Sequence, residues 1–357
     1  MGGSGRLECD YCGNTYDVAE IEALQAEKEE QAAEAFQNAE AAKEDSAAAE
    51  EEEAWDTSGL SSDWGAEAEG MRAYVCPSCG AELICDETTA ATSCPYCGNP
   101  TIVPGQFSGT LKPDFILPFK LDKAQAIEAL KRHYGGKRLL PRAFVEKNHI
   151  AEVKGVYVPF WLYDGTADTE LTFRATRSLV RREGDFNVTT TEHFDVLRRA
   201  DVAFEKVPVD ASRKMPDDYM DSIEPYDYAE LKPFSTAYLP GFLADKYDMS
   251  AEDCAERADL RCRNSAVRIV AGTVAGYESC VPVGETVRLR RGRVHYALLP
   301  VWMLSTRYED KNYLFAMNGQ SGKLVGDLPV SQSRFWSTFA MIALPIAAIL
   351  ALVWLFL

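Results

Sequence analysis

The sequence predicts an α+β protein in three parts: a small β module at a cysteine cluster, a body rich in antiparallel β-hairpins with helices, and one C-terminal transmembrane helix. Three observations predict this organisation. Two C-x-x-C pairs occur within residues 76–97, hairpin signals follow one another between residues 153 and 330, and the last 23 residues carry no charged side chain.

The two C-x-x-C pairs predict a metal site. Cys76 and Cys79 form the first pair, Cys94 and Cys97 form the second, and each pair is followed by a glycine. A glycine can adopt the positive φ that turns backbone N–H groups toward sulfur. The fourteen residues between the pairs, 80–93, suit a short strand, a turn and a returning strand. Because four thiolates complete a tetrahedral set, the pattern indicates a zinc ribbon with a closed structural site.

The spacing of the four cysteines does not identify the metal. Zn²⁺ is the expected ion, but the same four thiolates would hold one iron in a rubredoxin-like site. Cys85 lies between the pairs, and we expect a small, half-buried apolar residue there rather than a fifth ligand. The other cysteines indicate a reducing compartment with free thiols rather than a disulfide framework.

The N-terminal segment, residues 1–16, contains half of another knuckle, formed by Cys9 and Cys12. Two thiolates cannot close a tetrahedral site, so this is a possible second, incomplete metal site. Three explanations remain: the chain begins late, another molecule supplies two ligands, or the pair is vacant. We expect a late start, and no signal peptide precedes the pair.

An acidic linker rich in Ala and Glu is expected over residues 17–70. Residues 17–69 hold 18 carboxylates against two lysines, a net charge of −16, which leaves −2 of the total −18 for the other residues. This composition favours a solvated helix or a partly disordered segment. Trp55 and Trp64 either form a partner-binding motif in this linker or pack on the module that follows.

The zinc ribbon is expected over residues 71–104 and the body over residues 105–330. A capping box at Asp122 predicts a helix ending at Gly135-Gly136, and a second at Ser250 predicts a helix ending near residue 275. Between and after these helices, strands are predicted over 156–163, 170–182, 189–207, 286–290, 293–306, 313–317 and 323–328, with turns at 183–185 and 291–292.

Two short segments of the body resemble each other in sequence. Tyr157-Val-Pro-Phe-Trp161 resembles Leu298-Leu-Pro-Val-Trp302, and each segment lies in a predicted β-hairpin. A duplicated β unit would produce this similarity, and so would two buried tryptophans that anchor one core.

The C-terminal residues 335–357 predict a transmembrane helix. At 1.5 Å per residue they reach roughly 34 Å, which exceeds a bilayer core of about 30 Å. Trp336 and Trp354 lie near the two ends, where interfacial aromatic residues are common, and Arg334 precedes the segment. We therefore expect a single-pass protein of the cell membrane, with the bulk of the chain in the cytoplasm.

Several of these segments resemble a bacterial family of membrane-anchored proteins described as carrying a zinc ribbon like that of transcription factor IIB. The resemblance covers nearly the whole chain and rests on the segments 74–82, 88–100, 155–161, 240–248 and 315–329. Family members usually begin with a complete ribbon, and the missing first pair before Cys9 is the departure here. The resemblance implies no specific biochemical activity.

Some members of that family are labelled a primosomal replication-restart helicase, and the sequence does not support this label. A helicase needs a phosphate loop, G-x-x-x-x-G-K-[ST], whereas the nearest string, Gly319-Gln-Ser-Gly-Lys-Leu324, has the wrong spacing and no hydroxyl after the lysine. We find no catalytic residues and no small-molecule cofactor motif, and we do not expect an enzyme.

Three functional classes remain. The first is a membrane-tethered scaffold or adaptor that recruits a cytoplasmic protein, with the bilayer bound through the C-terminal helix. The second is nucleic-acid binding by the ribbon, which is disfavoured because residues 72–112 hold two basic and three acidic side chains. The third is electron transfer at an iron held by the four thiolates. We expect the scaffold.

Overall fold

The computed structural model describes residues 6–8, 15–17, 54–68, 70–89, 93–100, 102–105, 110–147, 152–309 and 311–356. The chain divides into two units, Met1–Ala54 and Trp55–Leu357. In the first unit, β1 (Arg6–Glu8) pairs antiparallel with β2 (Thr15–Asp17). Cys9, Cys12 and the acidic segment up to residue 53 lie outside the described residues, so the second metal site and the structure of that acidic segment stay predictions.

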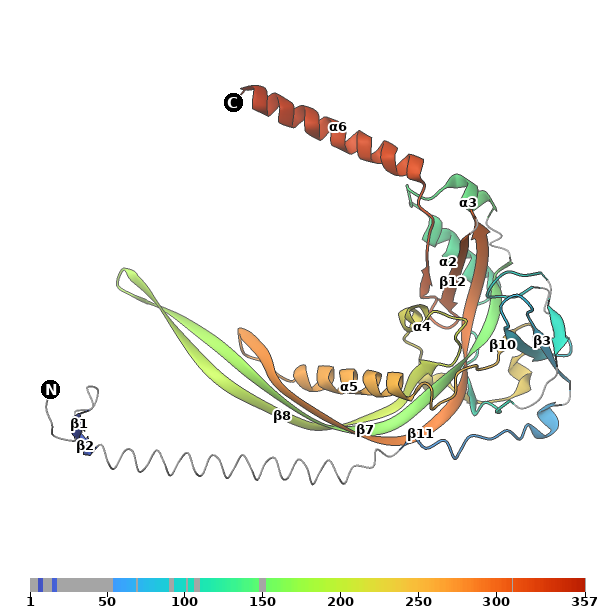
Figure 1. The fold of residues 1–357 in the computed structure, drawn as a ribbon, viewed down its shortest axis with the longest axis horizontal. Coiled ribbons are helices and arrows are strands. Elements are labelled where there is room, and N and C mark those ends of the chain that lie inside the picture. Colours follow the sequence, from blue (N-terminus) through green and yellow to red (C-terminus); the bar gives the residue numbers. More distant parts are fainter. Residues whose placement is uncertain are drawn as a thin grey trace. The chain divides into compact units, whose positions relative to one another are not determined.

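The second unit is strand-rich with helices, which confirms the predicted α+β class. Its strands are β3 (Met71–Val75), β4 (Glu82–Asp86), β5 (Val103–Gly105), β6 (Phe115–Ile116), β7 (Lys154–Glu183), β8 (Phe186–Asp210), β9 (Lys232–Pro233), β10 (Leu243–Asp245), β11 (Ser279–Tyr308), β12 (Lys311–Asn318) and β13 (Leu324–Gly326). Its α-helices are α2 (Lys123–Tyr134), α3 (Arg142–Lys147), α4 (Asp217–Ile223), α5 (Ala255–Ala271) and α6 (Gln332–Phe356). The main sheet has the order β13-β12-β11-β7-β10-β4-β3-β5, and β8 pairs with β7 (Figure 1).

The body repeats a β–α–β–β unit. The first copy is β6–α2–β7–β8, and the second is β10–α5–β11–β12. The long strands β7 and β11 pair antiparallel around Val158 and Leu299, which brings Pro159 opposite Leu298 and Pro300 opposite Tyr157. The two similar segments, residues 157–161 and 298–302, therefore lie at equivalent positions on two equivalent strands.

The two copies exchange their first strands. β6 pairs in parallel with β11, and β10 pairs in parallel with β7, at matching positions of the two long strands. The two tryptophans repeat the exchange: Trp302 donates its indole N–H to the Leu121 carbonyl at 3.1 Å, and Trp161 donates to the Met249 carbonyl at 3.0 Å. The Leu121 carbonyl lies just before α2 of the first copy, and the Met249 carbonyl lies just before α5 of the second copy. Each copy's tryptophan is therefore hydrogen-bonded to the segment that leads into the other copy's helix.

The capping box predicted at Asp122 is formed, whereas the bonds predicted at Ser250 form in the turn before α5, whose N-cap, Cys254, makes no side-chain cap hydrogen bond. The Asp122 carboxylate accepts from the Gln125 N–H, and the Gln125 side chain accepts from the Asp122 N–H. Ser250 and Asp253 exchange the same two hydrogen bonds at 3.1 Å. At Asp122 these reciprocal bonds satisfy two of the N–H groups left unpaired at a helix start. The helix α2 ends at Gly135, as predicted.

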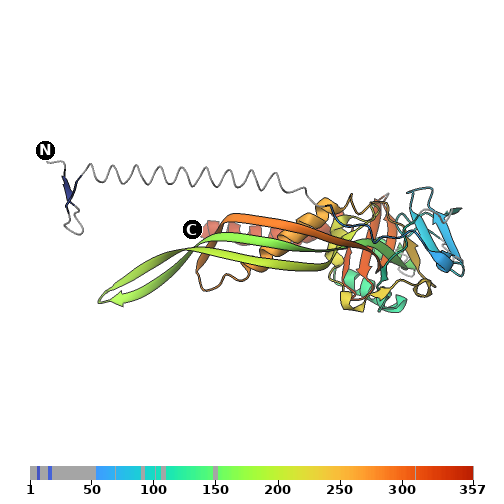
Figure 2. The ribbon, with the colours of Figure 1, turned by 90° about the horizontal axis from the view of Figure 1, so that it is seen from below.

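Three strands continue past the body as a long ribbon, which we call the arm. It comprises residues 165–206 of β7 and β8 and residues 279–291 of β11, and it is visible as three strands side by side in Figures 1 and 2. β11 stops pairing at Thr176, so only the β7–β8 hairpin continues beyond that residue. We call its end, residues 177–192, the tip.

The predicted breaks in these strands are wrong. Residues 164–169 and the turn expected at Arg291-Gly292 lie inside continuous strands of 30 residues each. Register shifts occur there instead, between Tyr163 and Gly165 and between Arg291 and Val294. A Cβ on Gly292 would lie 2.4 Å from the Asp164 carbonyl oxygen, so the glycine permits a close backbone approach at a β-bulge.

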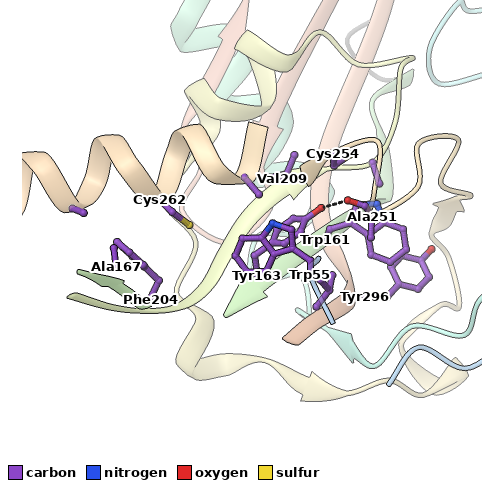
Figure 3. Close-up of a cluster of buried hydrophobic side chains, with 14 of the residues drawn as sticks. Trp55, Trp161, Tyr163, Ala167, Phe204, Val209, Ala251, Cys254, Cys262 and Tyr296 are labelled. Atoms are coloured by element: carbon purple, nitrogen blue, oxygen red, sulfur yellow. Dashed lines mark hydrogen bonds between the residues drawn. The ribbon is translucent and has the colours of Figure 1, made fainter. Parts of the chain in front are cut away.

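Helix α5 covers one face of the arm (Figure 1). Its buried side chains recur every four residues and are mostly small, which lets the helix lie close to the strands. They pack in one cluster with Ala167, Leu171 and Phe204 of the arm. Figure 3 shows Ala167 and Phe204 together with Cys262 of α5. The α5 residues are Ala258, Cys262, Ala266 and Val270.

The two tryptophans expected in the linker pack on the body. Trp55 lies edge-on to Tyr163 with ring centroids 4.8 Å apart, and its N–H donates to Asp259 of α5 at 3.1 Å. Trp64 donates to the Thr110 carbonyl at 2.9 Å and packs on Phe234. Both side chains therefore serve the core of the second unit.

A buried ion-pair network joins α5 to the end of β8. Asp210 is 1% exposed, and its carboxylate accepts from Arg257 at 2.6 Å. Burial raises the pKa of Asp210 to about 6, and Arg257 opposes this shift. Because the folded pKa lies above the reference value of 3.8, protonation of Asp210 stabilises the fold, and that contribution is lost as the pH rises through 6.

The substitution Arg257→Met should therefore destabilise the protein by about 3 kcal/mol at pH 7.5, because it leaves a buried carboxylate without a countercharge. The loss should be much smaller at pH 5, where Asp210 binds a proton. Thermal unfolding of the full chain in mild detergent, followed by circular dichroism, measures both values. Adding Asp210→Asn should restore stability and remove most of the pH dependence, and an equal loss at both pH values would contradict this account.

Candidate metal centre

The four cysteines lie in a module built on β3, β4 and β5. β3 pairs with both β4 and β5, and the other edge of β4 pairs with β10 of the body. The expected returning strand between the knuckles is not found in residues 87–89 or at Ser93, and residues 90–92 lie outside the description. The partners of β4 come instead from outside the interval, because the module continues the body sheet.

The two knuckles have the same backbone structure. Gly80 and Gly98 both have φ of 71°, the left-handed conformation predicted for them. Each glycine N–H donates to the carbonyl of the first cysteine of its knuckle, at 2.8 and 3.1 Å. The Cys76 N–H donates to Ala81 and the Cys94 N–H to Asn99, each at 2.8 Å. These turns bring both thiols of a knuckle to the same side.

The four sulfur atoms converge on one point. All lie within 4.8 Å of one another, with 3.7 Å between Cys76 and Cys97 and 3.5 Å between Cys79 and Cys94. A tetrahedral ion with metal–sulfur bonds of about 2.3 Å has sulfur–sulfur edges of about 3.8 Å. The cysteines are free thiols rather than disulfides, and their spacing fits a bound metal ion.

Backbone N–H groups supply part of the positive potential in the site. Burial alone would raise the pKa of Cys76, but the N–H groups of Cys79 and Ser78, together with the Cys79 and Cys97 thiols, lower it to about 7. Burial raises the pKa of Cys79 to about 11. Protons therefore compete with a metal for these thiolates, and acid favours release of the ion.

Cys85 lies outside this cluster. Its side chain is fully buried, and its thiol donates to the Thr89 carbonyl at 3.2 Å. Burial raises its pKa to about 11, which keeps the thiol protonated. The structure therefore places Cys85 in the core of the module, and Cys76, Cys79, Cys94 and Cys97 are the candidate ligands.

Polar side chains that the sequence analysis missed join the second knuckle to the body. Tyr96 is buried beside Asp245 of β10 and Ser212. Ser212 donates to Asp245 at 2.7 Å, and the Lys154 ammonium donates to the Ser93 carbonyl at 2.5 Å. No local motif signals these residues, because they come together only when β10 pairs with β4 and β7.

A polar cleft of about 900 Å³ borders the second knuckle. Cys94 and Cys97 line one wall, and Lys154, Met303 and Asn312 from the strands of the body line another. The four thiols complete their own set without a ligand from the cleft. The arrangement therefore suits a closed structural ion rather than an open catalytic one.

Helix α6 is long and apolar enough to cross a membrane. The span Gln332–Trp354 has 23 residues and a mean hydropathy of 2.2, and none of it is buried. Pro345 lies inside the helix. This agrees with the C-terminal segment predicted from the sequence.

Comparison with known proteins yields one informative relative. The chain is 38% identical over 319 residues to the uncharacterized protein YdjG of Bacillus subtilis, a match that spans 76% of this chain and 94% of the relative. The chain belongs to the family of this Bacillus protein. No protein-family model matches the chain. No solved structure matches it either.

The ligand assignment predicts about one metal ion per chain in the purified protein. The substitution Cys76→Ser should remove it, because three thiolates cannot close the site, whereas Cys85→Ser should retain it. Elemental analysis of both variants, each checked for folding by circular dichroism, measures the difference. Loss of the metal from Cys85→Ser alone would overturn the ligand set, and a clear excess over one ion would implicate Cys9 and Cys12.

Proposed function

We propose that this protein is a membrane-tethered scaffold whose zinc-bound module and body present the arm to a protein partner in the cytoplasm. The observation that carries the proposal is the exposure of large apolar side chains at the tip. Leu179, Val180 and Phe186 are 66%, 63% and 76% exposed. Leu179 and Phe186 lie on one face of the two-stranded tip and Val180 on the other. Large apolar side chains exposed at the end of a ribbon are typical of an interaction site.

The charges at the tip favour a protein partner over an anionic lipid surface. Arg181 is paired with Glu183 at 2.9 Å, and the turn also contains Asp185. The three arginines and three carboxylates of residues 177–192 cancel, so the tip offers an anionic headgroup layer no net attraction. A protein with an apolar pocket and a polar rim complements this pattern better.

The metal has a structural role in this proposal. A Zn²⁺ ion held by Cys76, Cys79, Cys94 and Cys97 would fix the two knuckles. Tyr96, which is buried beside residues of the body, would hold the second knuckle against the body. We favour zinc over iron because Zn²⁺ is the ion that structural sites of four cysteines ordinarily hold. The function proposed for the protein is accordingly recruitment, with no catalytic step.

Nucleic-acid binding by the module is weaker as an alternative. Lys112 is paired with Glu67, and Lys246 is paired with Glu82. These pairs reduce the positive charge available for phosphate contacts, which supply most of the affinity in such complexes.

The tip variant Leu179→Ser/Phe186→Ser tests the proposal. Full-length protein is crosslinked in cells, purified in mild detergent and compared with wild type for proteins that copurify. A partner enriched with wild type should fall at least about tenfold with the variant, because central apolar anchors dominate interface affinity.

The control is Leu197→Ser/Val281→Ser, which removes apolar side chains of similar exposure from another part of the arm. It should keep the partner. Retention of every partner by the tip variant, or an equal loss in both variants, would contradict recruitment through the tip.

A deletion tests whether α6 attaches the protein to the membrane. Deletion of residues 335–357 should move the protein from the membrane fraction to the soluble fraction, because those residues supply most of the apolar span. Sedimentation of cell fractions at high salt, with circular dichroism of the soluble product, measures this. Continued association with membranes would mean that the body binds lipid independently of α6.

A further inference from the structure

We propose that the base of α6 contains a binding site for the headgroup of an anionic phospholipid. The site is formed by the loop between α2 and α3 together with Arg334, in a hollow of about 420 Å³. This inference rests on the proposed membrane insertion of α6 and adds a lipid preference to it. Its lining residues are Tyr134, Gly136, Lys137, Arg138, Leu140, Arg142 and Arg334.

The charge of this hollow is unlike that of the chain as a whole. Four of its lining residues are basic and none is acidic, although the chain has a net charge of −18. The basic stretch is also continuous in sequence, because residues 129–145 contain five Lys and Arg side chains and no carboxylate. Among the described residues, no carboxylate forms an ion pair with Lys137, Arg138 or Arg142, and all three are exposed.

Hydrogen bonds fix the loop to the start of α6. The Ser331 N–H donates to the Leu139 carbonyl at 2.9 Å, and the Arg334 guanidinium donates to the Leu140 carbonyl at 2.6 Å. Gly136 has φ of 75°, a conformation that glycine adopts without strain, and it sets the path of the loop. Lys137, Arg138 and Arg142 are thereby held within a few residues of the apolar span.

This placement identifies the occupant. The apolar span begins at Gln332, so the hollow lies at the depth where the headgroups of the adjoining leaflet begin. A phosphate group there would accept from several cations at once, and basic pockets at the ends of membrane helices bind anionic headgroups in this way. Some basic side chains of the arm are instead paired locally, as Arg199 is with Glu170 at 2.6 Å and Arg181 is with Glu183 at 2.9 Å.

The experiment compares the full-length protein with the variant Lys137→Gln/Arg138→Gln/Arg142→Gln. Arg334 is kept, because its side chain holds the loop to the helix. Native mass spectrometry of detergent-purified protein titrated with dioleoyl phosphatidylglycerol measures bound lipid, and dioleoyl phosphatidylcholine is the zwitterionic comparison. We expect wild type to prefer phosphatidylglycerol and the variant to lose at least about tenfold in its affinity, since each cation near an anionic surface contributes up to about fivefold.

Two controls separate charge from folding and from position. The variant Arg138→Lys/Arg142→Lys should retain the preference, because it keeps the charge. The variant Arg174→Gln/Arg182→Gln/Arg290→Gln removes three exposed cations from the arm and should also retain it. Equal binding of both lipids by wild type, or an equal loss in the arm variant, would overturn the site.

Inorganic phosphate distinguishes a lipid from a soluble anion. Phosphate at about 10 mM should displace little phosphatidylglycerol, because the acyl chains add apolar contact with α6. Full displacement by phosphate would overturn the assignment to a lipid. Cell fractionation separates this result from the proposed function: wild type absent from membranes would refute the tether itself, whereas wild type in membranes without a lipid preference would refute only this site.

Discussion

The fold depends on the exchange of first strands between the two β–α–β–β copies. Each long strand receives a short parallel strand from the other copy, and each tryptophan donates to the carbonyl before the other copy's helix. Packing around the exchange is close. A Cβ on Gly155 would lie 2.4 Å from the Phe242 ring, and Phe242 stacks on Phe119 at 4.3 Å. Neither copy can complete its core without the other.

This exchange also positions the functional elements. β10 is the first strand of the second copy, and its outer edge pairs with β4 of the cysteine module. The β7–β8 hairpin of the first copy is lengthened into the arm, whereas β11 and β12 of the second copy form a short hairpin against α2. The strand that follows β12 leads directly to α6. The cysteine module, the arm and the apolar helix α6 are thus all connected to the two exchanged copies.

The sequence predicted the features that depend on residues close together in the chain. The positive φ of Gly80 and Gly98, the capping box of α2 and the apolar C-terminal helix follow from residues that are close in sequence. The Cys–Cys spacing likewise predicted which thiols converge. The zinc itself, the partner and the orientation in the membrane remain proposals.

Long-range pairing was harder to predict. Asp164-Gly165 and Arg291-Gly292 have the composition of turns, yet both continue through their strands as bulges. Asp164-Gly165 lies between β8 and β11, whereas Arg291-Gly292 lies between β7 and an isolated bridge to Asp56. The burial of Asp245 and Asp210 depends on strands and helices far away in sequence, so no motif signals it. The basic hollow at α6 was missed for the same reason, because residues 137–142 and Arg334 are nearly 200 positions apart.

Hydrogen–deuterium exchange of the full-length protein in mild detergent tests the central claim most directly, namely that the exchanged copies form one cooperative frame. The amides of residues 156–162, 243–245 and 297–303 should exchange in the slowest class and with the same dependence on denaturant, since they open only in a common unfolding event. If residues 156–162 and 297–303 exchanged at different denaturant concentrations, the copies would be independent domains and the account would be wrong.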